Sequence, residues 1–319
     1  MHVLVTGGMG NLGRATMREL LRRGCGVRCL DLPTPRNRRR ARALPRAVEV
    51  RWGDIRTAAD VEAAVRDCDV VVHLAGIIPP LANERPNLAE AANVGGSRNV
   101  FSAAARQGRP PRVLLASSLD VFGPTGHLRP PRVVTDPLVP TDNYSRHKIQ
   151  SEGELRASGL PWAIYRFAVM PVLGPNPPHP VMFDIPLETR MELLHVEDAA
   201  LAVAAGVTGG GIWNRIWLIG GGPSCQVTYE RYLRAMLAAV GLPMLPQQAF
   251  GARPYCTDWL DTRASQELLR FQRHSFEELV AEVARHAGVA RLLAPVVAPL
   301  VMRRLLAMSP HHRASVGRG

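Results

Sequence analysis

The sequence predicts an α/β protein built on a doubly wound parallel sheet, with a small C-terminal substrate-binding region. Three observations predict this fold. The chain opens with a strand, a glycine-rich turn and a helix. Short apolar runs then recur with helical stretches between them, as in sheets whose two faces are both covered. After Phe167 the pattern loosens into a proline-rich stretch.

The first 31 residues form one recognisable unit. An apolar strand (His2 to Thr6) leads through the glycine turn into a helix (Leu12 to Arg23), and the next strand ends at Asp31. The turn fits two spacings, G-x-G-x-x-G with Gly8, Gly10 and Gly13, and G-x-x-G-x-x-G with Gly7, Gly10 and Gly13. Glycines let the backbone approach a pyrophosphate, and a carboxylate at a strand end can accept both ribose hydroxyls. An ordinary strand-to-helix turn needs neither three glycines nor an acid at this place, so the unit predicts dinucleotide binding.

Five further apolar runs are predicted strands, at 48–52, 70–76, 112–118, 162–167 and 216–221. Ligands of doubly wound, Rossmann-like sheets bind at the carboxyl ends of the strands. Small and polar residues collect at those ends here, among them Asp54 and Ser118.

The predicted domains are residues 1–169, which bind the dinucleotide, and 170–319, from which 194–222 returns to the main sheet. The proline-rich stretch 169–186 is expected to cover the substrate. A helix begins at His195 with Asp198 as its expected cap, and further helices are expected at 229–240 and 262–269. The apolar C-terminal tail is interrupted by prolines and arginines. We expect it to dock on its own domain, with attachment to a membrane surface as the alternative.

Composition limits the partners. The net charge of +12 includes six arginines between Arg36 and Arg46, which could hold a 2′-phosphate or nucleic acid. No aromatic residues are interleaved with them, so we interpret the run as a solvated face and expect no nucleic-acid partner. The five cysteines show no metal-type spacing, which is typical of thiols in a reducing cytoplasm and predicts no metal. No apolar run reaches about 18 residues and Met1 leads directly into a core strand, so neither a membrane partner nor a signal peptide is expected.

Tyr144 and Lys148 lie four apart at the start of a helix predicted over 144–156, and therefore on one face of it. Lys148 is the only lysine in a chain with 38 arginines. A compact ammonium beside a phenol is expected to lower the tyrosine pKa and make it an acid/base near neutral pH. Ser118 ends a strand on the same rim and can hydrogen-bond a reacting oxygen. Each residue alone could be structural, but together they predict a catalytic group.

These motifs resemble those of the extended short-chain dehydrogenases/reductases of the NAD-dependent epimerase/dehydratase family. The resemblance covers nearly the whole chain and includes TGGMGNLG, HLAG, NVGGSRNV, ASSLDVFG, YSRHK, LLHVEDAA and WLDTRASQELLRF. It implies NAD as cofactor and Ser118, Tyr144 and Lys148 as catalytic residues. The cofactor-binding residues it implies are Gly7, Gly10, Asn11, Leu12, Gly13, Asp31, Asp54, Ile55, Leu74, Ala75, Gly76, Asn93, Tyr144 and Lys148. It also implies a homodimer formed by the helices at 86–107 and 144–156.

Departures from the family pattern concern the substrate. Family members that act on nucleotide sugars usually carry an arginine four residues before the histidine of HVED, where this chain has Met191, with Arg190 one place off. Six residues are expected to make an apolar substrate lining, namely Met170, Val172, Leu173, Val181, Met182 and Phe183. His195 is expected to pack and hydrogen-bond rather than react. Asp120 is interpreted as a turn acid bonded to the backbone, with an enolising base as the alternative.

The sequence therefore predicts an NAD-dependent oxidoreductase that moves a hydride between a small secondary alcohol or carbonyl compound and the nicotinamide. Asp31 predicts NAD over NADP, because its carboxylate would repel a 2′-phosphate. Two alternatives remain, a nucleotide-sugar epimerase, dehydratase or decarboxylase with tightly bound NAD, and an NAD-binding regulator without turnover.

Overall fold

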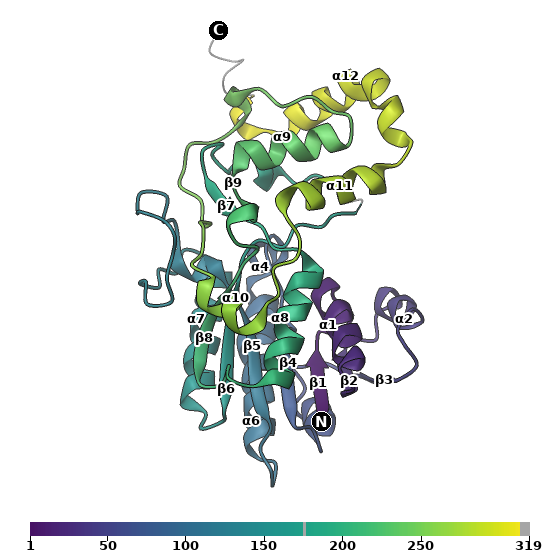
Figure 1. Cartoon of the computed structure of the whole chain (residues 1–319), viewed down its shortest axis with the longest axis vertical. Coiled ribbons are helices and arrows are strands. Elements are labelled where there is room, and N and C mark those ends of the chain that lie inside the picture. Colours follow the sequence, from purple (N-terminus) through teal and green to yellow (C-terminus); the bar gives the residue numbers. More distant parts are fainter. Residues whose placement is uncertain (175–176, 313–319) are drawn as a thin grey trace.

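The main sheet confirms the predicted doubly wound topology. In the computed structural model, which describes residues 1–174 and 177–312, seven parallel strands run in the order β3-β2-β1-β4-β5-β6-β8 (Figure 1). Their bounds are β1 His2–Thr6, β2 Gly26–Asp31, β3 Val48–Trp52, β4 Val70–His73, β5 Arg112–Ser118, β6 Trp162–Phe167 and β8 Arg215–Ile219. The order reverses between β1 and β4, which makes the carboxyl ends of these two strands the expected ligand site.

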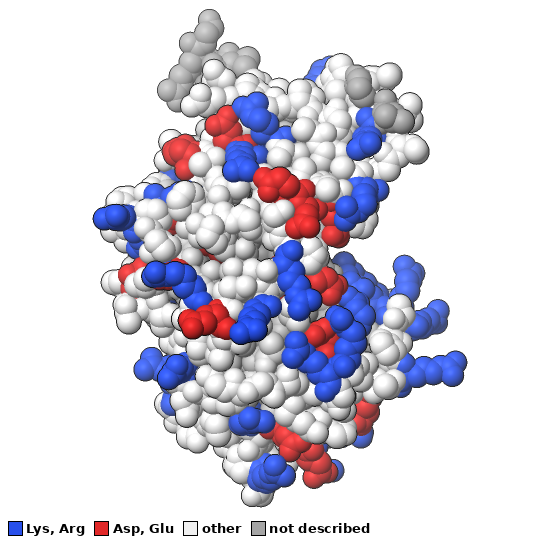
Figure 2. Space-filling model, in the orientation of Figure 1, with Lys and Arg blue, Asp and Glu red and all other residues white. Residues whose placement is uncertain are grey.

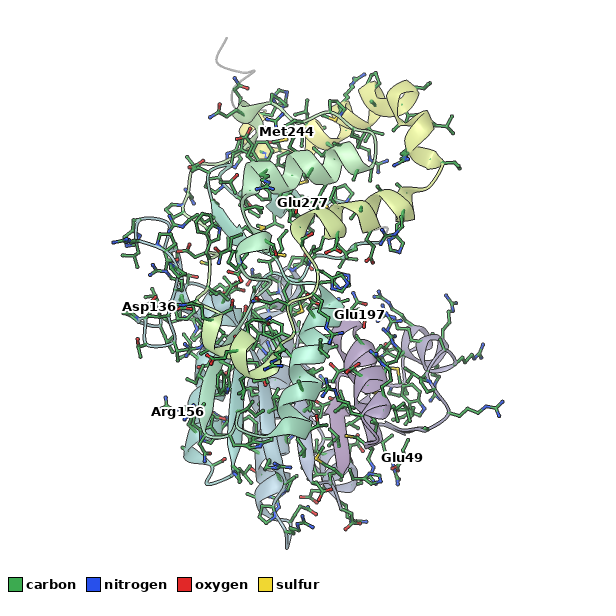
Figure 3. All side chains as sticks on the ribbon, viewed as in Figure 1. Glu49, Asp136, Arg156, Glu197, Met244 and Glu277 are labelled. Atoms are coloured by element: carbon green, nitrogen blue, oxygen red, sulfur yellow. The ribbon has the colours of Figure 1, made fainter. Side chains whose placement is uncertain are left out.

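Helices cover both faces of the sheet. One face carries α1 (Asn11–Arg22) and α8 (Val196–Gly209), which pack against each other, with α10 (Arg263–Leu269) beside α8. Glu197, labelled in Figure 3, lies at the start of α8. It accepts a hydrogen bond from Arg18 of α1 at 2.7 Å. The other face carries α3 (Ala58–Val65), α6 (Gly96–Ala105) and α7 (Asn143–Ala157). Short helices α2 (Pro35–Ala41), α4 (Leu81–Glu84) and α5 (Pro86–Glu90) lie in the connections.

A smaller unit lies at the carboxyl ends of the strands of the main sheet (Figure 1). It contains the antiparallel pair β7 (Arg190–Glu192) and β9 (Gln226–Thr228), and the helices α9 (Tyr229–Ala239), α11 (Phe276–Ala287) and α12 (Ala290–Met308). Its core explains why the proline-rich stretch is apolar. Leu173 and Phe183 are buried in that core and Met182 packs against it. The prediction that these residues line the substrate site is therefore wrong.

The three remaining members of that set differ in their surroundings. Met170 packs against the main core, Val172 is 51% exposed, and only Val181 faces the cleft described below. Residues 175–176 of the predicted covering stretch and 313–319 of the tail lie outside the described residues. Among residues 1–174 and 177–312, no helix combines the length and the apolar character needed to cross a bilayer.

Candidate active site

The glycine turn after β1 is shaped by close approach of backbone to backbone. Gly7 has φ +70°, and a Cβ there would lie 2.8 Å from the Cα and N of Ala75. A Cβ on Gly13 would lie 2.5 Å from the Gly7 carbonyl oxygen and 2.6 Å from the Gly8 Cα. Only glycine fits either position. Gly10 then caps α1 without a side-chain bond, which leaves the N–H groups of the first helical turn open to an anion.

A cleft of about 490 Å³ opens above this turn, and we call it the glycine-turn cleft. Of the residues predicted to bind the cofactor, Gly7, Gly10, Asp31, Asp54, Ile55, Leu74, Ala75 and Gly76 line it. Its position at the strand-order reversal and its lining by the glycine turn and a strand-end acid fit an extended dinucleotide. Arg56 forms a bidentate ion pair with Asp54, and this pairing lowers the pKa of Asp54.

Asp31 is fixed at one end of this cleft. Its carboxylate accepts hydrogen bonds from Met9 N (2.8 Å), Leu32 N (2.8 Å) and Asn37 Nδ2 (3.0 Å). Two carboxylate oxygens offer about four acceptor positions, so one remains for a ribose hydroxyl. Burial raises the pKa of Asp31, while the backbone hydrogen bonds and Arg40 oppose that shift.

Arg40 corrects the interpretation of the basic run. Its Nη1 donates to Met9 O at 2.8 Å, and the side chain lines the glycine-turn cleft together with Asn37. The run between Arg36 and Arg46 is thus not wholly a solvated face. Sequence reasoning missed both residues, because the backbone partner of Arg40 lies 31 residues away in the chain.

Several predicted cofactor residues do not line the cleft. Asn11 and Leu12 lie in the first turn of α1, with Gly13 packed beneath the glycine turn. Asn93 is 4% exposed and braces the loop after β4, because its Oδ1 accepts from Ile77 N at 2.7 Å and its Nδ2 donates to Ile77 O at 2.9 Å. Its backbone carbonyl also accepts from Ser151 of α7 at 3.1 Å. Asn93 sits in a π-helical turn and connects the loop after β4 to helix α7, which carries Tyr144.

Ser118, Tyr144 and Lys148 come together where β5 meets α7. The Ser118 hydroxyl lies close enough to the Tyr144 phenol to lower the pKa of the phenol, and the Lys148 Nζ lies 5.6 Å from the centroid of the Tyr144 ring. Lys148 Nζ donates to Ala116 O at 2.7 Å. A Cβ on Gly76 would lie 3.9 Å from that Nζ, so the lysine stands next to the glycine-turn cleft. Helix α7 is held in place by a capping box between Asp142 and Ser145.

The predicted lowering of the tyrosine pKa is wrong for the protein without ligands. Burial raises the pKa of Tyr144, the Asp120 carboxylate raises it further, and the hydrogen bond with Ser118 opposes both effects. Lys148 is held by the backbone of β5 instead of the phenol. Burial lowers the pKa of Lys148 to about 8, against the influence of Glu152 and Asp120.

A second cleft, of about 650 Å³, begins at Asp120, and we call it the Asp120 cleft. Its lining is acidic, although the chain has a net charge of +12. Among residues 1–174 and 177–312, its lining includes four carboxylates (Glu84, Asp120, Asp142 and Asp184), one histidine (His179) and neither arginine nor lysine. The other lining residues are Pro79, Pro80, Asn83, Thr141, Pro180, Val181, Tyr255 and Cys256.

Asp120 lies beside Ser118 and Tyr144. Its carboxyl group hydrogen-bonds the Ser118 hydroxyl and lies close enough to Tyr144 to raise the pKa of the phenol. Burial raises the pKa of Asp120 to about 7, Asp142 adds to that shift, and Ser118 and Lys148 oppose it. The interpretation of Asp120 as a turn acid bonded to the backbone is therefore wrong, since this carboxyl stands between Ser118 and the Asp120 cleft.

Arg190 is committed to a structural ion pair. Its Nε donates to Asp258 Oδ1 at 2.6 Å, and its Nη2 donates to Leu128 O at 2.8 Å. Asp258 is 1% exposed and also accepts from the Thr125 hydroxyl at 2.7 Å. This pairing fixes the loop after β5 against the smaller unit, so Arg190 does not face the Asp120 cleft.

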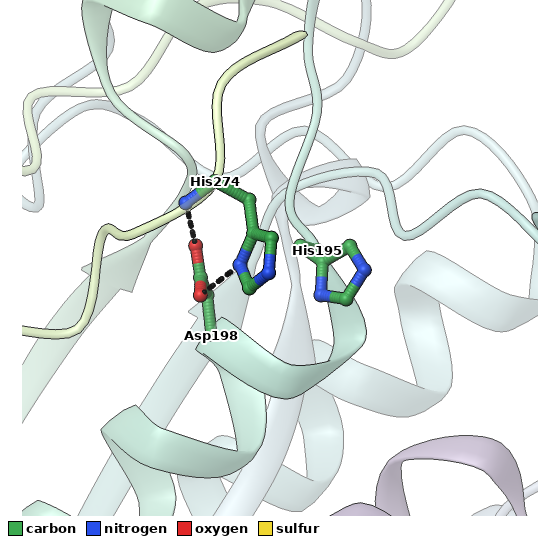
Figure 4. A group of neighbouring side chains, drawn as sticks. All are labelled: His195, Asp198 and His274. Atoms are coloured by element: carbon green, nitrogen blue, oxygen red, sulfur yellow. Dashed lines mark hydrogen bonds and ion pairs between the residues drawn. The ribbon is translucent and has the colours of Figure 1, made fainter. Parts of the chain in front are cut away.

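His195, Asp198 and His274 form a third polar group, shown in Figure 4. The imidazoles of His195 and His274 stack with centroids 3.9 Å apart and planes inclined by 18°. Lone pairs in two nearly parallel rings cannot converge on one metal ion at the usual 2.0–2.1 Å. Both ring nitrogens of His195 have partners instead, as His195 Nδ1 accepts from Glu197 N and His195 Nε2 contacts Glu282.

This group also corrects a helix cap. The prediction that Asp198 caps α8 is wrong, because His195 is the N-cap and Asp198 instead binds the segment that precedes α11. Its carboxylate accepts from Arg273 N (2.9 Å), His274 N (3.0 Å) and His274 Nδ1 (2.6 Å). The predicted packing role of His195 agrees with these contacts.

Comparison with known proteins gives one family and several partial relatives. The model of the NAD dependent epimerase/dehydratase family matches residues 3–183, more than half of the chain. The chain is 35% identical over 129 residues to 3 beta-hydroxysteroid dehydrogenase type 7 of Mus musculus, covering 39% of this chain and 35% of that protein. It is 33% identical over 165 residues to D-erythronate dehydrogenase of Cupriavidus necator, covering 48% of each.

The chain thus spans between about a third and a half of the curated relatives it matches. Among solved structures, the UDP-glucose 4-epimerase of Thermus thermophilus in complex with NAD superposes with a TM-score of 0.72. That superposition covers 90% of this chain and 99% of the other at 23% identity. At this identity the likeness shows the fold alone.

Proposed function

The chain belongs to the NAD-dependent epimerase/dehydratase family, and we propose that it is an NAD-dependent oxidoreductase acting on a secondary alcohol or the corresponding carbonyl compound. The observation that carries this proposal is the meeting of Ser118, Tyr144 and Lys148 between the two clefts. A protein that only bound the cofactor would not need a proton-transfer pair there.

The glycine-turn cleft is suited to hold the cofactor. Asp31 would accept a ribose hydroxyl, the glycine turn and the start of α1 would bind the pyrophosphate, and Gly76 would lead the nicotinamide end toward Lys148. When bound, NAD accepts or supplies the hydride. The remaining steps belong to the side chains of this chain.

In this mechanism the Tyr144 phenol exchanges a proton with the substrate oxygen. Ser118 hydrogen-bonds that oxygen and holds it against Tyr144. The raised pKa of Tyr144 in the unliganded protein keeps the phenol protonated, which is the form that reduction of a carbonyl requires. For oxidation of an alcohol, the positive charge of Lys148 would favour the phenolate once the nearby carboxyl is protonated.

The Asp120 cleft supports an uncharged substrate. A nucleotide sugar brings a diphosphate, which needs fixed cationic donors. The part of the lining that the structure describes has four carboxylates and no arginine or lysine, and Arg190 is bound to Asp258. A small sugar acid would meet the same repulsion. The relatives named as steroid and erythronate dehydrogenases support an alcohol dehydrogenation, and the acidic lining of the cleft favours an uncharged alcohol as the substrate.

The proposal is tested by following nicotinamide absorbance with three substrate classes: apolar secondary alcohols such as hydroxysteroids, sugar acids such as D-erythronate, and UDP-sugars. Turnover confined to the uncharged alcohols is expected. Tyr144→Phe should keep NAD binding and lose about 10² to 10⁴ in rate, whereas Tyr232→Phe, a matched change on α9, should behave as the parent protein.

Three outcomes would overturn the proposal. Full activity in Tyr144→Phe would remove the mechanism. Conversion of a UDP-sugar without net change in the cofactor would establish an epimerase instead, and deuterium uptake from solvent next to the carbonyl, lost in Asp120→Asn, would establish a dehydratase.

A further inference from the structure

The outer face of the C-terminal helix α12 is apolar. Five aliphatic side chains at the start of the helix and along it are 47–80% exposed, namely Val289, Leu293, Val296, Val297 and Leu300. At about 100° per residue, their spacing places them in one arc roughly 100° wide. We call this arc the outer stripe.

The outer stripe is distinct from the side of α12 that holds the helix in place. Ala294 and Leu305 are buried, and Val301 and Met302 pack on the core of the smaller unit. The expected docking of the tail on its own domain thus uses one side of the helix. Helix α12 lies at the far end of the molecule from the N-terminus, away from the main sheet (Figure 1). An exposed, contiguous apolar surface of this kind marks an interaction site.

Charge identifies the partner. From residue 283 to the end, the sequence contains six arginines and no aspartate or glutamate. Arg303 and Arg304 are exposed and lie one turn beyond Leu300, Arg303 beside the arc of the outer stripe and Arg304 within it. Among the described residues, Figure 2 shows white and blue atoms over α12 and no red ones. An apolar stripe that carries only cations at its end is complementary to a bilayer surface that contains anionic lipid.

A second copy of the chain fits this surface poorly. A symmetric contact through the outer stripe would join two copies of a segment whose charged side chains are all arginines, with no carboxylate from residue 283 onward to compensate them. The helix is also not suited to cross a bilayer, because it carries three arginines and no described helix reaches the apolar character needed.

We propose that α12 attaches the protein to the surface of a membrane containing anionic lipid, with the outer stripe immersed among the lipid chains and the arginines at the headgroups. This attachment is independent of the catalytic residues and of the proposed reaction.

The test is flotation of the full chain with vesicles of phosphatidylcholine, with or without phosphatidylglycerol. Binding to the anionic vesicles is expected, and it should weaken as NaCl rises from about 0.1 M to about 0.5 M, since salt screens the arginines. Leu300→Asp should weaken binding by about tenfold or more. Leu268→Asp is the matched control, because Leu268 is an exposed leucine (44%) on α10, and it should bind like the parent chain.

A second variant separates apolar contact from net charge. Val296→Ser/Leu300→Ser leaves the charge unchanged and should also lose most of the binding. The proposal is overturned by equal losses in Leu300→Asp and Leu268→Asp, by normal binding of the serine variant, or by absence of binding in the parent chain. It is also overturned if the parent chain is a dimer that the serine variant converts to monomers.

Discussion

Replacement of Asp120 by asparagine should make folding stability less dependent on pH. In the folded protein the carboxyl holds its proton up to about pH 7, because burial and Asp142 raise its pKa from the ordinary 3.8. In the unfolded chain the proton is lost near the ordinary value. Between these values the folded state binds more protons, so the contribution of Asp120 to stability is complete at low pH and is lost as pH rises through about 7.

The shift of about three pKa units corresponds to ~4 kcal/mol, at about 1.4 kcal/mol for each unit. Asparagine has the same shape and no proton to lose, so the variant keeps this contribution. Its stability relative to the parent should therefore increase by up to ~4 kcal/mol between about pH 4 and pH 8. For 319 residues at about 2.1 cal/mol/K each, that difference corresponds to a Tm change of ~6 °C.

The measurement is thermal unfolding of the parent and the variant in steps from about pH 4 to about pH 9, without cofactor. Groups that both proteins share contribute equally to their stability, so their effects cancel in the difference. One such group is His73, whose burial lowers its pKa to about 3. Asp67→Asn, at an exposed turn, is the matched control and should follow the parent at every pH. If the Asp120→Asn curve runs parallel to that of the parent, the carboxyl is charged and solvated at neutral pH and the described surroundings of Asp120 are incorrect.

Three further predictions concern the clefts and the frame around them. Titration calorimetry should show tighter binding of NAD than of NADP, because Asp31 would repel a 2′-phosphate; the opposite order would mean that Arg40 binds that phosphate. Gly13→Ala should lower NAD affinity by about tenfold or more, because its Cβ would lie 2.5 Å from Gly7 O, while Gly153→Ala on the surface of α7 should leave affinity unchanged. Arg190→Gln should lower the free energy of unfolding by about 3 kcal/mol, as it leaves the buried Asp258 without its main partner. Arg263→Gln, whose side chain is 91% exposed, should change it by less than about 1 kcal/mol, and equal losses would contradict the structural role of Arg190.

The main sheet could be predicted from sequence because its strands are buried on both faces. Runs such as HVLVT and RVLLASS contain a signal that needs no tertiary context, and β1 and β5 have the predicted bounds. The pair β7 and β9 was not predicted, since strands of three residues contain too few positions for a pattern. Helix α11 was also missed, although Ser275 and Glu278 form a capping box that the sequence shows.

At the site, the motifs identified the residues correctly but did not predict their pKa shifts. The spacing of Tyr144 and Lys148 predicts a shared helix face, and both lie on α7. The direction of the Tyr144 pKa could not be predicted, because it depends on burial and on Asp120, which comes from another element. In the same way, Arg40 and Asp198 obtain their partners from chain segments 31 and 75 or 76 residues away, and no local pattern contains that information.

The single lysine makes it possible to measure the fraction of molecules in which α7 has opened. A protease that cuts only after lysine has one target bond in this chain, and that bond lies within α7, next to a side chain that is 9% exposed. Cleavage there requires α7 to leave the sheet, so a brief pulse of the protease yields two fragments, of residues 1–148 and 149–319, only from molecules that have opened. The ratio of intact chain to these fragments therefore reports the open fraction directly, and ligands that fill the glycine-turn cleft can be ranked by how far they reduce it.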